Sequence, residues 1–198
     1  MIQRFSGMNK GRMEAFSDGV LAIIITITVL EIRSPHESNV QALQPLIPIF
    51  LSYALSFVYL GIYWNNHHHL MHAVKKVNGA VLWANLHLLF WLSLIPFVTS
   101  WMGGNHFAAV PVAVYGLLLA LAGAAYFVLT RTLIRVPGQD SVLAESVGGD
   151  TKSKISVLSY VVAAPIALVW PRIAFGCYAL VAIVWLVPDR RIERTLVE

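Results

Sequence analysis

The stretch RMEAFSDGVLAIIITITVL, residues 12–30, decides the fold of this chain. Its first part carries the ionisable side chains of Arg12, Glu14 and Asp18, and its last eleven residues are apolar apart from two threonines. A helix needs about 20 mostly apolar residues to cross a bilayer. The stretch therefore predicts a membrane helix over residues 12–32, with charged groups at one mouth.

The composition extends this reading to the whole chain. Of its 198 residues, 58% are hydrophobic and 12% are charged, whereas soluble domains average about 25% charged residues. The net charge of +4 comes from basic residues in short segments between apolar runs, so it favours membrane orientation and excludes nucleic acid as an expected partner. Cys177 is the single cysteine, so no disulfide can form within the chain.

The apolar runs predict an all-α membrane protein with one domain over residues 1–198. Six transmembrane helices are expected, over residues 12–32, 45–73, 80–102, 107–133, 155–170 and 172–187. The last two are short and meet at Pro171, a residue that suits the first position of a helix, so they read as a tight hairpin. The polar stretch 136–154 is the one long connection.

The lysines and arginines predict the orientation. If the N-terminus is placed in the cytoplasm, the cytoplasmic segments contain 12 of the 14 lysines and arginines. Only Arg33 and Arg172 fall on the outer side. The inner group is Arg4, Lys10, Arg12, Lys75, Lys76, Arg131, Arg135, Lys152, Lys154, Arg190, Arg191 and Arg194. The positive-inside rule then places both termini in the cytoplasm, which requires an even number of spans.

The ionisable side chains at the start of the first predicted helix need polar partners. Arg12 and Asp18 are six residues apart, so they point to different sides of a helix and cannot pair simply within it. Asp18 therefore requires water or a donor from another helix. The alternative is that Ser17 and Asp18 cap the start of the helix.

Further along the helix, Ile23, Ile27 and Leu30 are spaced by four and three residues and form one stripe, bordered by Thr26. In a membrane helix such a stripe is also typical of ordinary packing. Spacing alone does not distinguish a pore from a packed face.

These residues resemble a known family. Arg12-x-x-x-Phe16-Ser17-Asp18, followed by Gly19 and an Ile/Leu/Thr-rich helix, is similar to the signature of the transmembrane protein 175 family of potassium channels. Trp64-x-x-His67-His68 in the second span resembles a second element of the family. The remaining spans match only in number and length.

The resemblance implies a homotetramer whose first helices line a central pore. It implies that Ile23, Ile27 and Leu30 are the apolar pore positions, with a ring of Ile23 as the constriction and Thr26 one turn towards the outside. It also implies a structural polar network that ties the first helix to its neighbours. The network positions are Arg12, Phe16, Ser17, Asp18, Trp64, His67 and His68.

A pore of this kind would work without the usual filter. The chain has no T-V-G-Y-G sequence and no regular Arg or Lys ladder. A narrow apolar ring dewets and makes ion passage costly, and potassium holds its water less tightly than sodium. The Thr26 hydroxyl either replaces some of that water or bonds back to the carbonyl of Ala22. Permeant potassium is expected, and no cofactor.

The histidines of the second predicted span raise the question of a metal-binding site. His68 and His72 have the i, i+4 spacing of helical metal ligands, but His67, His68 and His69 spread around the helix. No acidic or cysteine ligand lies nearby in sequence, unless Asp18 contributes. Trp64 and His67 are better read as hydrogen-bond donors to the first helix, so no metal is predicted.

The expected function is therefore a potassium-permeable cation channel in the bilayer of a prokaryotic inner membrane. A proton- or cation-coupled secondary transporter is the alternative, since Asp18 and the histidines could relay protons. Internal repeats and broken helices, which are frequent in transporters, are not apparent. An enzyme is not expected, because the sequence lacks an H-E-x-x-H motif and a plausible acid pair.

Overall fold

The computed structural model describes residues 10–137 and 151–186, and every regular element within these ranges is helical. The elements are α1 (Lys10–Leu30), the 3₁₀ helix η1 (Val40–Leu46), α2 (Ile47–Ala73), α3 (Gly79–Ser93), α4 (Ile95–Gly104), α5 (Ala109–Ile134), α7 (Thr151–Ile166) and α8 (Pro171–Leu186). The predicted all-α class is confirmed. Four of the predicted inner basic residues, the predicted end of the last span at 187 and most of the 136–154 connection lie outside the described residues; the four are Arg4, Arg190, Arg191 and Arg194.

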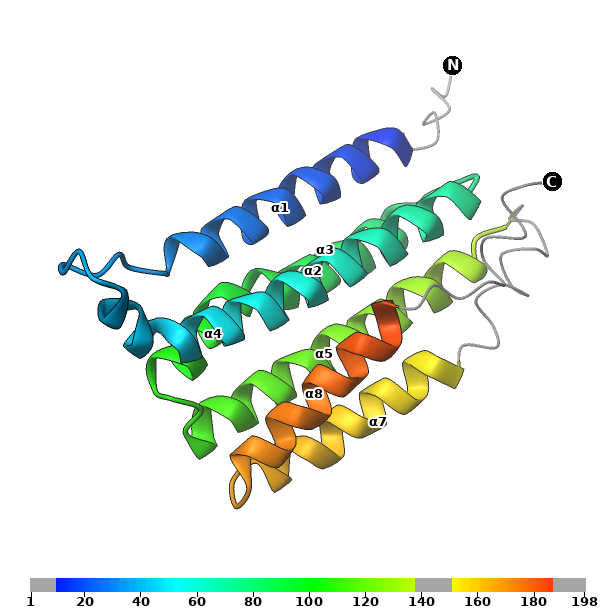
Figure 1. Ribbon diagram of the computed structural model, residues 1–198. Coiled ribbons are helices and arrows are strands. Elements are labelled where there is room, and N and C mark those ends of the chain that lie inside the picture. Colours follow the sequence, from blue (N-terminus) through cyan, green and yellow to red (C-terminus); the bar gives the residue numbers. More distant parts are fainter. Residues whose placement is uncertain (1–9, 138–150, 187–198) are drawn as a thin grey trace.

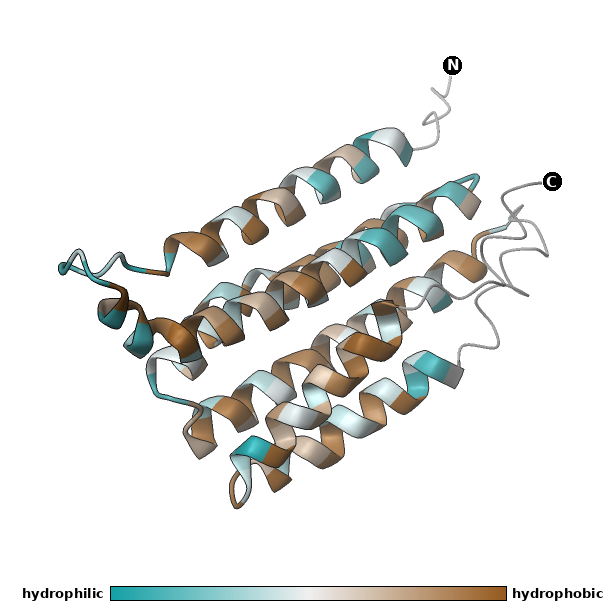
Figure 2. Ribbon diagram, in the orientation of Figure 1, coloured by the Kyte–Doolittle hydropathy of each residue, from teal (hydrophilic) through white to brown (hydrophobic). Residues whose placement is uncertain are grey.

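The helices form a bundle that the chain traverses up and down (Figure 1). The start of α1, the end of α2 and the end of α5 share one end of the bundle, and the end of α8 points the same way. Figure 2 shows hydrophobic residues along the helices and hydrophilic ones mainly near helix ends and in connections. Within residues 10–137 and 151–186, four apolar helical runs are long enough to span a membrane: Lys10–Leu30, Val40–Ala73, Gly79–Gly104 and Ala109–Ile134.

The third apolar run, predicted as one span over residues 80–102, is long enough to cross a membrane, but its helix is interrupted once. It consists of α3 and α4, which meet at Leu94. The cause is Pro96 near the start of α4, because proline has no N–H and its ring clashes with the preceding turn. The Leu94 N–H instead closes a tighter turn onto the Trp91 carbonyl at 3.3 Å.

The bundle is held by close apolar packing and a few internal polar contacts. Gly116 of α5 lies against the buried Tyr178 ring of α8, where a Cβ atom would clash with the phenol. The Ser56 hydroxyl of α2 lies 2.6 Å from Thr99 Oγ1 of α4 and 2.9 Å from Tyr115 Oη of α5. Small residues and shared hydroxyls are the usual means of joining helices in lipid, where apolar side chains gain nothing by leaving the solvent.

Helix α1 lies at the edge of this bundle, against α2, α3 and α4. Its buried residues form one stripe at helical spacing: Met13, Ser17, Leu21, Ile24 and Thr28. On one side of the helix, the described residues leave the α1 side chains largely exposed. The bundle therefore presents one long apolar helix with a free face.

Candidate functional site

The free face of α1 contains the predicted pore positions. Ile23 is 58% exposed, Ile27 is 42% exposed and Leu30 is 76% exposed. At about 100° per residue they lie roughly 110° around the helix from the centre of the buried stripe. Such large apolar side chains require lipid or another protein surface as a partner.

A groove of about 790 Å³ runs between α1 and α4 beside this face. Ile23 and Ile27 line it from α1, and Phe97 and Trp101 line it from α4. Glu31, just after α1, is among its polar residues. The groove is open, apolar for most of its lining, and suited to receive the side chains of a second apolar helix.

Thr26 lies on the exposed side of α1 and its hydroxyl is already engaged as a donor. Thr26 Oγ1 donates to the carbonyl of Ile23 at 2.9 Å. The bond to the Ala22 carbonyl, one of the two alternatives from the sequence, is not formed. A hydroxyl oxygen that donates its proton keeps two acceptor lone pairs, and Thr26 is exposed. Thr26 can therefore act as an acceptor towards a cation while its proton stays on the backbone.

Asp18 is tied to α2 by the indole of Trp64. Trp64 Nε1 donates to Asp18 Oδ1 at 3.1 Å. Because α1 begins at Lys10, Asp18 lies in the third turn and does not cap the helix start. Ser17 does not cap it either, because its hydroxyl donates to the Met13 carbonyl at 2.8 Å. The capping alternative is wrong.

A buried polar chain links α1, α3 and α2 beside this contact. Asn85 Nδ2 donates to Ser17 Oγ at 2.9 Å, and Asn85 Oδ1 lies 2.8 Å from His67 Nε2. The single proton of Ser17 is used on Met13, so Asn85 must present its NH₂ group to Ser17 and its oxygen to His67. His67 consequently carries a proton on Nε2. All three linked side chains are buried.

Sequence reasoning missed Asn85. The signal was present, because an amide inside an apolar run of a membrane helix is costly unless it bonds across to another helix. Two other predicted network residues are placed elsewhere. Arg12 is exposed and Phe16 is 53% exposed, both on the free side of α1, and the described residues give Arg12 no hydrogen bond or ion pair.

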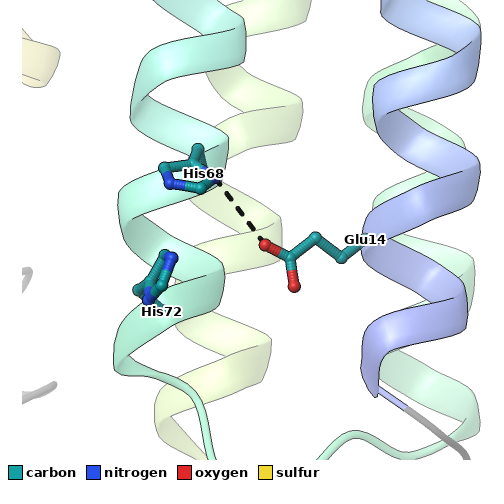
Figure 3. Close-up of side chains that lie close together, drawn as sticks. All are labelled: Glu14, His68 and His72. Carbon is teal, nitrogen blue, oxygen red and sulfur yellow. Dashed lines mark ion pairs between the residues drawn. The ribbon is translucent and has the colours of Figure 1, made fainter.

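His68 faces a carboxylate that the sequence interpretation did not pair with it. Glu14 of α1 points at His68 of α2, with Nδ1 and Oε1 3.7 Å apart, and His72 lies one turn further along α2 (Figure 3). The His68 ring also stacks on Trp64 and meets the His72 ring edge-on at 4.6 Å between centroids. The expectation that no acid but Asp18 could approach these histidines is therefore wrong.

The fold and this site define an α-helical integral membrane protein with several spans, whose edge helix is oriented by polar contacts. Residues 12–96 match the family described as endosomal/lysosomal potassium channel TMEM175. A potassium channel of Chryseobacterium sp. (strain P1-3) is 56% identical over 96% of this chain and 100% of its own. The chain belongs to the TMEM175 family.

One solved structure and one animal protein are also similar to this chain. A crystal structure of a lysosomal potassium-selective channel TMEM175 homolog from Chamaesiphon minutus superposes with a TM-score of 0.77, at 27% identity, over 90% of this chain and 96% of that one. The endosomal/lysosomal proton channel TMEM175 of Homo sapiens is 38% identical over 37% of this chain and 17% of its own length. The predicted family and the membrane class are thus confirmed.

Proposed function

We propose that this chain forms a potassium-permeable cation channel in which four copies of α1 surround the pore and Ile23 forms its apolar constriction. The observation that carries the proposal is the free apolar face of α1 with Ile23, Ile27 and Leu30 uncovered. The named activity of the similar proteins, potassium channel, supports the choice of ion. Six membrane crossings per chain and cytoplasmic termini belong to the same proposal.

The polar contacts of α1 explain why that face is presented outward. Ser17 is buried against Asn85 of α3, and Asp18 is held by Trp64 of α2. These two bonds fix the rotation of α1 about its own axis. With Ser17 turned into the bundle, the stripe containing Ile23 has to face away from it. The network thus acts as a positioning device for the pore helix.

The constriction acts through water. Four Ile23 side chains around one axis offer no hydrogen bonds, so a narrow ring between them is unfavourable to water and to hydrated ions. Widening the ring lets water enter, and the ion barrier falls. Potassium, which gives up water more easily than sodium, passes the partly dehydrated step more readily.

Reconstitution tests the function directly. The purified chain in proteoliposomes, with potassium on one side and sodium on the other, is expected to give unitary current steps and a reversal potential near that of potassium. The detergent complex is expected to have the mass of four chains of 21.9 kDa. Slow saturable flux would identify a transporter, and a proton-dominated current would assign this chain the ion named for the animal relatives.

Thr26 is expected to contribute to the choice of ion. If a ring of four Thr26 oxygens favours potassium by about 1 kcal/mol, Thr26→Ala lowers the potassium-to-sodium permeability ratio about fivefold, because 1.4 kcal/mol corresponds to a factor of ten. The measurement is the reversal potential in mixed potassium and sodium.

Thr28→Ala is the matched control for Thr26→Ala. Thr28 is buried and its hydroxyl donates to the Ile24 carbonyl at 2.7 Å, so its removal should leave the permeability ratio unchanged. An unchanged ratio in Thr26→Ala would remove Thr26 from the selectivity mechanism.

A further inference from the structure

Glu14, His68 and His72 form a cluster near the start of α1 and the end of α2 (Figure 3). Each side chain offers one donor atom, and these donor atoms all lie within 4.8 Å of one another. Glu14 and His68 are half-buried, and His72 is exposed. Two helices therefore converge on one small volume, and His72 leaves it partly exposed.

The donor set selects a class of cation. Two imidazoles and one carboxylate form a set that zinc uses in proteins, with a further position for water. Magnesium and calcium prefer shells of oxygen ligands, and Glu14 is the one oxygen donor of the cluster. We propose that Glu14, His68 and His72 bind a transition-metal cation, with Zn²⁺ as the probe, which bridges α1 and α2.

The geometry needs only small side-chain movements. Bonds of about 2.0–2.2 Å place tetrahedral ligand atoms roughly 3.4 Å apart. His68 Nδ1 and Glu14 Oε1 are already 3.7 Å apart, and the widest separation in the cluster closes by rotation of side chains that are at least partly exposed. The i, i+4 spacing of the two histidines puts both on one face of α2.

The neighbouring contacts do not compete with the metal. Asp18 is engaged by Trp64, and His67 is turned inward to Asn85, so neither is required as a ligand. Stacking on Trp64 holds the His68 ring beside Glu14. A bound cation would join α1 to α2 one turn before the Trp64–Asp18 contact and reinforce the same helix pairing.

Zinc titration of the purified full chain, with any affinity tag removed, tests this site by calorimetry. The wild type is expected to bind one Zn²⁺ per chain with saturation, and Mg²⁺ should not compete. Because removing even an outer partner of a metal ligand costs about 10–100-fold in affinity, His72→Ala and Glu14→Gln should each weaken zinc binding by at least that amount. The assay involves no ion flux, so its result is independent of the proposed channel function.

His69→Ala is the matched control, because His69 is adjacent to His68 but points about 100° away around the helix. It should retain the wild-type affinity. Zinc should also raise the unfolding temperature of the wild type and of His69→Ala, but not of His72→Ala or Glu14→Gln. Absence of saturable binding, equal loss in His69→Ala, or full affinity in Glu14→Gln would overturn the proposal.

Discussion

Ile23→Ser is expected to raise potassium current and to reduce its selectivity. In a tetramer the substitution replaces four apolar side chains at the proposed constriction with small hydroxyls that water can wet. Lowering the barrier at this point by about 1.4 kcal/mol raises the flux about tenfold. The measurement is single-channel conductance in symmetric potassium, followed by the reversal potential against sodium.

Ile183→Ser in α8 provides a matched control for this change. Ile183 is 59% exposed and Ile23 is 58% exposed, so both substitutions remove the same side chain from equally open positions. Ile183 lies on a different helix from the proposed pore face. The conductance of the Ile183→Ser variant should therefore equal that of the wild type. Unchanged conductance in Ile23→Ser would rule out Ile23 as the narrow point.

A second comparison distinguishes a pore from a lipid-facing surface. If the Ile23 face touched lipid, Ile23→Ser would place a hydroxyl in hydrocarbon at a modest cost in stability and leave the current unchanged. If the face lines a pore, conductance rises without loss of the tetramer. Measuring mass and conductance on the same preparation therefore separates the two locations of α1.

The existence of the long helices could be predicted from sequence because it depends on apolar length, a local property. The break at Leu94 could have been predicted as well, since Pro96 lies within the third apolar run. The prediction of one span over residues 80–102 used apolar length alone, and the mean hydropathy stays high across Pro96. Local composition thus predicts spans better than it predicts their interruptions.

Partners between helices could be predicted only in part. The need of Asp18 for a donor followed from the cost of a charge near lipid, and Trp64 was among the candidates. The pairing of Glu14 with His68, and of Asn85 with both Ser17 and His67, depends on the rotation and axial position of three helices. A single sequence carries no direct record of those two quantities, so these contacts appear only in the folded chain.

Asn85→Leu is expected to give the largest loss of stability among changes to the polar network. The variant keeps the approximate size of the side chain but leaves the protonated Nε2 of His67 buried without an acceptor. A buried unsatisfied group costs about 1–3 kcal/mol, and a cross-helix hydrogen bond in a membrane contributes about 0.6 kcal/mol more. At about 2–4 °C per kcal/mol for a chain of this size, the unfolding temperature should fall by roughly 3–14 °C.

The double variant His67→Leu/Asn85→Leu tests whether this loss comes from the hydrogen bond. Replacing both partners by apolar groups removes the unsatisfied donor, so the double variant should regain part of the lost stability. Asn65→Leu, at an exposed position of α2, should unfold at the wild-type temperature. If Asn85→Leu were as stable as the wild type, the buried chain through Asn85 would not hold α1 in place, and another contact would have to fix the rotation that presents Ile23.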